Sequence, residues 1–111
     1  MSAAIEAQEL AQRIWPKRRT GSVKASLFEL TRFMRRHAPA GEDFTHRRAE
    51  TVWQGKVRRM DSWEMDALRL AEIEEARNEQ KRLRARLADL DAKIAEADAR
   101  EAGALASSPR A

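Results

Sequence analysis

Apolar residues in the first half of the chain recur every three or four positions, in stretches separated by proline, glycine and polar residues. This spacing predicts amphipathic helices. The first helix is expected over residues 2–15, because the residue before Pro16 is pushed out of helical conformation. Ser22 can cap a second helix. The buried face of that helix is expected to consist of Val23, Leu27, Leu30 and Met34, widened by Phe28 and Phe33.

The segment "HAPAGEDF" predicts a loop, and Thr45 after it is a plausible cap for a third helix that runs to Met60. Phe44 is expected to fold back toward Ala49. On this helix, the inner side would carry Ala49, Val52, Trp53, Lys56, Val57 and Met60. The outer side would carry Arg47, Thr51, Gln54 and Arg58, flanked by Arg48, Gly55 and Arg59.

Gly55 is a notable feature of this predicted helix. A glycine inside a helix costs about 0.5 to 1 kcal/mol relative to alanine, so its presence indicates a structural reason. That reason is a close approach of the backbone, either to a phosphate strand or to a neighbouring helix.

A long helix is predicted from "DSWE" to about Arg100, since no proline or glycine occurs before Gly103. Asp61 or Ser62 would cap it, with Glu64 as the carboxylate of a capping box. Its first part is expected to pack on the three short helices through Trp63, Ala67, Leu68, Leu70 and Ala71. Trp53 and Trp63 are expected in the core, whereas Trp15, beside a basic loop, is open between core packing and base stacking.

Beyond Ile73 the apolar stripe narrows to positions spaced alternately by three and four residues. They are Ile73, Ala76, Gln80, Leu83, Leu87, Leu90, Ile94 and Ala97. This is the heptad pattern of a coiled coil, and a lone helix cannot bury so narrow a stripe. Self-association, in parallel or antiparallel orientation, is therefore expected through Ile73, Leu83, Leu87, Leu90 and Ile94. The alternative is a solvated charged helix.

These elements predict an all-α fold with a small N-terminal three-helix head followed by one long helix that forms a coiled coil. The expected domains are a basic head over residues 1–72, an oligomerisation helix over 73–101 and a disordered tail over 102–111.

Charge is distributed unevenly along the chain, although the formal net charge is only +4. Residues 1–60 hold 13 Lys and Arg against 6 Asp and Glu, a net charge of +7, whereas residues 61–111 hold 9 against 12, a net charge of −3. A polyanion is therefore expected to meet the head. Two sets of candidate contacts are predicted: the loop residues Lys17, Arg18 and Arg19 for phosphates, and Arg47, Arg48, Thr51, Gln54, Arg58 and Arg59 on the third helix for base edges and phosphates. The alternative is that both are solvated surface.

Other function classes find little support in the sequence. There is no cysteine, and His37 and His46 are not at metal-ligand spacing, so no metal site or thiol nucleophile is expected. Since no phosphate-binding glycine loop occurs either, we expect no enzyme activity, no cofactor and no small-molecule substrate. No apolar run approaches the length of a membrane span and the N-terminus is unlike a signal peptide, which predicts a cytoplasmic protein.

The order of a short helix, a buried second helix, a loop and a basic third helix resembles DNA-binding heads of the helix-turn-helix type. The resemblance implies a small DNA-binding protein, a transcriptional regulator that binds duplex DNA. The expected coiled coil would make it a homodimer. A bacterial or phage source is associated with the excess of arginine, 17 residues against 5 lysines. RNA is an alternative polyanion. An adaptor or assembly protein, bound to a protein partner through the coiled coil, is an alternative of another class.

Overall fold

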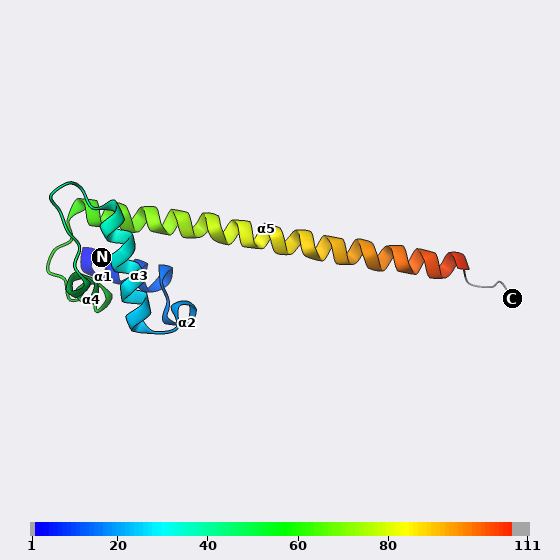
Figure 1. Cartoon of the computed structure of the whole chain (residues 1–111), viewed down its shortest axis with the longest axis horizontal. Helices are drawn as coiled ribbons and strands as arrows, with labels where there is room; N and C mark the ends of the chain where they lie inside the picture. The colour runs from blue at the N-terminus through cyan, green and yellow to red at the C-terminus, as the bar shows by residue number, and fades with distance from the viewer. Residues whose placement is uncertain (1, 108–111) are drawn as a thin grey trace. The chain divides into compact units, whose positions relative to one another are not determined.

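The computed structural model describes residues 2–107, and within them the chain is helical with no strand. The helices are α1 (Ala3–Ile14), α2 (Lys17–Thr20), α3 (Val23–His37), α4 (His46–Trp53) and α5 (Ser62–Ser107), as Figure 1 shows. The all-α prediction, with a small N-terminal helical part and a long C-terminal helix, is confirmed. The described residues form two units, one up to Glu75 and one from Ala76, and α5 contributes to both.

Hydroxyl side chains cap three of the helices at their N-termini. Each hydroxyl accepts a hydrogen bond from the backbone N–H three residues later, which would otherwise lack a partner within the helix. The pairs are Ser2 with Ile5 at 3.3 Å, Ser22 with Ala25 at 3.0 Å and Thr45 with Arg48 at 3.0 Å. The caps predicted at Ser22 and Thr45 are therefore confirmed.

The basic loop predicted after Pro16 is a one-turn helix, α2. The fixed φ of proline suits a position next to the first helical residue. Gly21, with a φ of +103°, ends the turn, and its N–H donates to the carbonyl of Lys17 at 2.8 Å. Lys17, Arg18 and Arg19 therefore lie in a short helix of their own and not in a loop.

Helix α4 ends at Trp53, and its predicted continuation to Met60 is wrong. Gly55 has a φ of +71°, and its N–H donates to the carbonyl of Val52 at 3.0 Å, while that of Lys56 donates to the carbonyl of Thr51 at 2.9 Å. This pair of hydrogen bonds is the Schellman motif, which ends helices at a left-handed glycine. Gly55 is thus not inside a helix, and Lys56 to Met60 belong to a non-helical segment.

A neighbouring helix approaches Gly55 closely. A Cβ atom at this position would lie 2.6 Å from Oε1 of Gln8, which belongs to α1. The close approach expected from the sequence is therefore made to α1.

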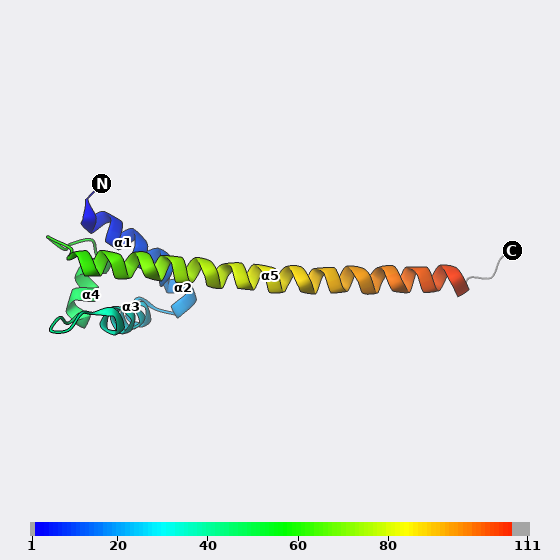
Figure 2. The same cartoon turned by 90° about the horizontal axis from the view of Figure 1, so that it is seen from above.

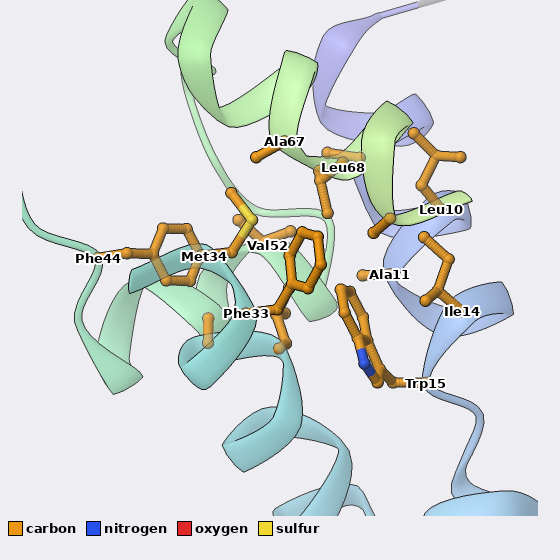
Figure 3. Close-up of a cluster of buried hydrophobic side chains, with 14 of the residues drawn as sticks. Leu10, Ala11, Ile14, Trp15, Phe33, Met34, Phe44, Val52, Ala67 and Leu68 are labelled. Carbon is orange, nitrogen blue, oxygen red and sulfur yellow. The ribbon is translucent and has the colours of Figure 1, made fainter. Parts of the chain in front are cut away.

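The first unit buries one hydrophobic core between its helices (Figure 3). The largest fully buried hydrophobic side chains are Phe44, Leu30, Met34, Leu68 and Val52. Phe44 and Ala49, expected to pack at the start of the third helix, are both fully buried.

Three side chains predicted to be buried are exposed instead, namely Val23, Phe28 and Leu70, at 39%, 61% and 38%. One residue turns a helix by about 100°, so Phe28 points away from the face that Leu27 buries, and Leu70 lies about 200° from Leu68. Val23 is the first residue of α3, at the edge of the packed region.

Trp15, for which the sequence left core packing and base stacking open, is more buried than Trp53 and Trp63, which were expected in the core. Trp15 is 8% exposed, and its ring centroid lies 5.6 Å from that of Phe33. Trp53 and Trp63 are only half-buried at the rim of the core, where Trp63 meets Phe44 edge-on at 6.3 Å. Trp15 is thus a core residue and is not available to stack on a base.

The first turns of α5 belong to the first unit and bury Met65, Ala67, Leu68 and Ala71. In the view of Figure 2, α1 lies on one side of these turns, and α3 and α4 lie on the other. Two ion pairs join α1 to α5: Arg69 with Glu6 at 3.0 Å and Arg13 with Glu72 at 2.7 Å. Both pairs are solvent-exposed, so apolar burial provides most of the attachment.

The second unit is the remainder of α5, and its described side chains, from Ala76 to Ala106, are all exposed. The helix continues to Ser107, so the disorder predicted for residues 102–107 is wrong, while residues 108–111 lie outside the described part. Alanine and leucine around Gly103 are strong helix formers, which offsets the roughly 1 kcal/mol that a glycine costs. Within residues 2–107, no helix combines the length and apolarity needed to cross a membrane.

Candidate nucleic-acid interface

An open cleft of about 530 Å³ lies where α4 meets the non-helical segment that follows it. It is lined by Arg48, Thr51, Lys56, Val57, Arg58, Arg59 and Asp61. Four of these residues are cationic and one is acidic. The cleft therefore gathers much of the positive charge that the sequence concentrates between Arg47 and Arg59.

Arg48 of α4, one of the lining residues, forms an ion pair with Glu64 of α5. Arg48 donates from Nε to Glu64 Oε2 at 3.0 Å and from Nη2 to Glu64 Oε1 at 2.8 Å. The Glu64 carboxylate is 2% exposed and also accepts the N–H of Asp61 at 2.9 Å, as the predicted capping box requires. The hydrogen bond to Glu64 raises the pKa of Arg48 above its ordinary value.

Arg48 also fixes the segment that forms the far wall of the cleft. Its Nη2 donates to the carbonyl of Arg59 at 2.7 Å. A single guanidinium thus joins α4, the start of α5 and the connection between them. Arg48, predicted as a nucleic-acid contact, is already engaged in the fold.

The other cations at the cleft have little internal compensation. Lys56 and Arg58 are exposed, and no carboxylate of residues 2–107 lies within 4.0 Å of either. Arg59 is 87% exposed, and its Nη2 lies 3.6 Å from Oδ1 of Asp61, a loose contact. Such charges attract an external anion because no neighbour neutralises them.

Arg47, Glu50 and Thr51 form the outer side of α4. Arg47 and Glu50 are exposed, and neither is within ion-pairing distance of an opposite charge among the described residues. Thr51 is half-buried and its hydroxyl donates to the carbonyl of Arg47 at 2.9 Å. The opposite side of α4 is occupied by the core, since Ala49 and Val52 are fully buried.

Gln54, which the sequence places on the outer face of the third helix, is the C-terminal cap of α4. Its backbone N–H donates to the carbonyl of Glu50 at 2.9 Å, and its side chain is exposed. It does not line the cleft.

His46, the first residue of α4, is exposed and is not among the contacts predicted from the sequence. It lines a second hollow of about 460 Å³ together with Phe28, Thr31, Arg32 and Arg35. Lys56 was also missed, because the helical phase that placed it inside does not apply beyond Trp53.

The basic residues of α2 lie apart from the cleft. Arg19 donates to the carbonyl of Ile14 and to Glu75 Oε1, the latter at 2.6 Å, and it lines a different hollow beside Trp15. Lys17 and Arg18 are exposed, with no ion-pair partner among residues 2–107. The structure therefore does not bring the two predicted sets of contacts into one cavity.

The residues predicted for oligomerisation form an uncovered apolar stripe on α5. Their exposed fractions are 49% for Ile73, 59% for Leu83, 59% for Leu87, 41% for Leu90 and 59% for Ile94. The core side chains of the first unit, by contrast, are buried. Residues 2–107 therefore offer no cover for this stripe.

Across residues 2–107, no three His, Asp or Glu side chains are grouped so that they could hold a metal ion. No protein-family model matches the chain, and comparison with curated proteins and with solved structures gives no significant match.

Proposed function

We propose that the protein binds duplex DNA through α4 and the segment that follows it, as a dimer joined through α5, and that it regulates transcription. The observation that carries this proposal is the cationic cleft at residues 48–61, whose exposed charges Lys56, Arg58 and Arg59 lack strong internal partners. The proposed role is binding without catalysis, in the cytoplasm of a bacterium or of a phage-infected cell.

The division of labour within this surface follows from the chemistry of its side chains. Arg47 and Thr51, on the outer side of a helix whose inner side is buried, are suited to base edges in the major groove. Lys56, Arg58 and Arg59, on non-helical backbone beside it, are suited to phosphates. Arg48 is assigned a structural role because its Nε and Nη2 groups already donate to Glu64 and to the Arg59 carbonyl.

The dimeric part of the proposal is supported by the exposed leucine and isoleucine stripe of α5. Two heads joined by a coiled coil can occupy two half-sites, which raises affinity through effective concentration. The same stripe also favours the second candidate, an adaptor or assembly protein whose α5 binds another protein. In that case the cationic cleft would be solvated surface.

Titration of fluorescent duplex DNA with the full chain at two salt concentrations tests the proposal. We expect micromolar or tighter binding that weakens steeply as salt rises, because bound cations displace counterions from the phosphates. A single-stranded RNA and an RNA duplex of matched length serve as controls and should bind more weakly. Absence of duplex binding at low salt would favour the adaptor function. Tighter binding to RNA than to DNA would show that RNA is the preferred polyanion.

A further inference from the structure

The exposed stripe of the second unit follows a regular heptad register from Ala76 to Ala97. In the usual notation, Gln80, Leu87 and Ile94 occupy a positions, and Ala76, Leu83, Leu90 and Ala97 occupy d positions. The residues on either side of the stripe are the e and g positions. In coiled coils these flanking residues determine which partner and which orientation are accepted.

The two flanks of the stripe change sign in opposite directions along the helix. The e positions are Arg77, Arg84, Asp91 and Asp98, and the g positions are Glu79, Arg86, Lys93 and Arg100. One flank thus runs from basic to acidic, while the other runs from acidic to basic. The orientation of a second helix therefore decides whether opposite or like charges face each other along the stripe.

Most of these charges have no ion-pair partner in the part of the chain that the structure describes. Among the described residues, no opposite charge lies within ion-pairing distance of Arg84, Arg86, Asp91, Lys93 or Asp98. Each g residue and the e residue five positions later lie on opposite sides of the stripe, so they do not meet on one helix. Glu79 contacts Arg82 at 2.7 Å, an exposed pair that solvent screens.

We propose that the partner of this stripe is a second copy of the chain, packed parallel and in register as a two-stranded coiled coil. This inference rests on the dimer of the proposed function and adds its orientation. In a parallel pair, each g residue faces the e residue five positions later on the other helix. The facing pairs are Glu79 with Arg84, Arg86 with Asp91, and Lys93 with Asp98, and every pair is of opposite sign.

An antiparallel pair matches the same charges less well. In that orientation g positions face g positions, and e positions face e positions. The register that aligns Leu87 with Leu90 and Leu83 with Ile94 forms three kinds of opposite-charge pair, namely Glu79 with Arg100, Arg77 with Asp98 and Arg84 with Asp91. It also brings Arg86 of one helix beside Lys93 of the other, whereas the parallel pair brings no like charges together. Like charges at these positions are unfavourable, so the parallel arrangement is preferred.

The core positions agree with the parallel, two-stranded arrangement. Ile94 is β-branched at an a position, while Leu83 and Leu90 occupy d positions, a combination that favours two strands. Gln80 then faces its own copy, and the two amides can hydrogen-bond to each other. A single polar a position of this kind fixes the register, because any shift would place it against an apolar side chain.

Cysteine cross-linking tests the orientation directly, because the chain contains no cysteine of its own. Ala76→Cys and Ala97→Cys introduce thiols at d positions near the two ends of the register, about 32 Å apart along the helix. Each variant should form a disulfide-linked dimer with itself under mild oxidation, since a disulfide needs Cα atoms about 4.4 to 6.8 Å apart. Ala99→Cys, on the outer face of the helix, is the matched control and should remain largely uncross-linked.

An antiparallel dimer would give a different result in the same experiment. Neither Ala76→Cys nor Ala97→Cys would cross-link to itself, whereas a mixture of Ala76→Cys and Glu101→Cys would cross-link. This result would overturn the parallel orientation but not the dimer. A trimer by sedimentation would overturn the two-stranded arrangement. A monomeric wild type at tens of micromolar would overturn this inference together with the dimer of the proposed function, while DNA binding would still be measurable.

Charge reversal tests the pairing independently of any cross-link. Arg86→Glu places a carboxylate opposite Asp91 of the other helix, and this like-charge pair occurs twice in the symmetric dimer. Self-association should weaken about tenfold. Adding Asp91→Arg restores opposite signs and should recover most of the loss. Lys81→Glu, away from the stripe, should leave association unchanged. If the double variant associates no better than Arg86→Glu alone, the proposed parallel pairing is wrong.

Discussion

Arg48 and its neighbour Arg47 show how adjacent cations on one helix take different roles. Arg47 is exposed, whereas Arg48 donates to the buried Glu64 carboxylate and to the Arg59 carbonyl. Sequence reasoning placed both residues among the nucleic-acid contacts. It could not separate them, because the deciding partner, Glu64, is sixteen residues away on another helix. Because that carboxylate is buried, Arg48 is needed as its counter-charge and contributes to the stability of the fold.

Replacing Arg48 with alanine should therefore destabilise the fold more than replacing Arg47. Removal of one partner leaves the Glu64 carboxylate buried without its counter-charge, which costs about 3 kcal/mol or more. Arg47→Ala should change the free energy of unfolding by less than about 0.5 kcal/mol, as surface substitutions usually do. Chemical denaturation followed by circular dichroism measures both. Equal stability of the two variants would show that the ion pair contributes nothing.

At the scale of the element, α4 illustrates what a helical pattern can and cannot predict. Its cap at Thr45 and its buried face were predictable, because both depend on local sequence. Its end at Trp53 was not, since a glycine followed by further amphipathic spacing is compatible with a longer helix. The left-handed Gly55 and its local hydrogen bonds end the helix, and the close approach of Gln8 is a tertiary feature that the local pattern does not show.

The missed ends of other elements have similar physical causes. One turn of helix after Pro16 has too few residues to show a period, and α5 continues past Gly103 because its neighbours are strong helix formers. The order of the main helices and most of the core were predictable, because amphipathic spacing in α1, α3 and α5 is unambiguous. The cleft could not be predicted, since it exists only because α4 stops where it does.

Gly55→Ala should destabilise the first unit by more than about 1 kcal/mol. Alanine disfavours a φ of +71°, and its Cβ would lie 2.6 Å from the Gln8 side chain. Gly103→Ala is the matched control, because nothing lies within 4 Å of a Cβ there and the backbone is helical. That variant should raise the helical content seen by circular dichroism. A neutral Gly55→Ala would contradict the Schellman ending of α4.

At the scale of the whole molecule, the two units divide the proposed function between them. The first unit has a buried core and carries the cationic cleft, while the second exposes a stripe that a single chain leaves uncovered. The proposed dimer covers the stripe and links two DNA-binding surfaces. Neither unit would bind tightly to a paired site alone, because affinity for such a site depends on joining the heads.

Leu87→Asp combined with Leu90→Asp should separate association from folding. Both leucines are exposed in the single chain, so the first unit should keep its melting transition, while the charges make burial of the stripe unfavourable. Sedimentation should show a monomer, and affinity for a paired DNA site should fall about a hundredfold. Unchanged sedimentation would mean that the stripe does not join the chains.

The central claim is that the cleft beside α4 grips DNA phosphates, and the salt dependence of binding tests it most directly. The variant Lys56→Ala with Arg58→Ala, folded as judged by circular dichroism, should bind DNA with a weaker salt dependence. The magnitude of the slope of log affinity against log salt should fall by about two units per head. Lys17→Ala with Arg18→Ala, which removes the same charge from α2, shows how much of the loss is due to net charge alone. The cleft variant should lose more affinity than this control. If it binds duplex DNA with the affinity and salt slope of the wild type, the cleft is solvated surface and the account is contradicted.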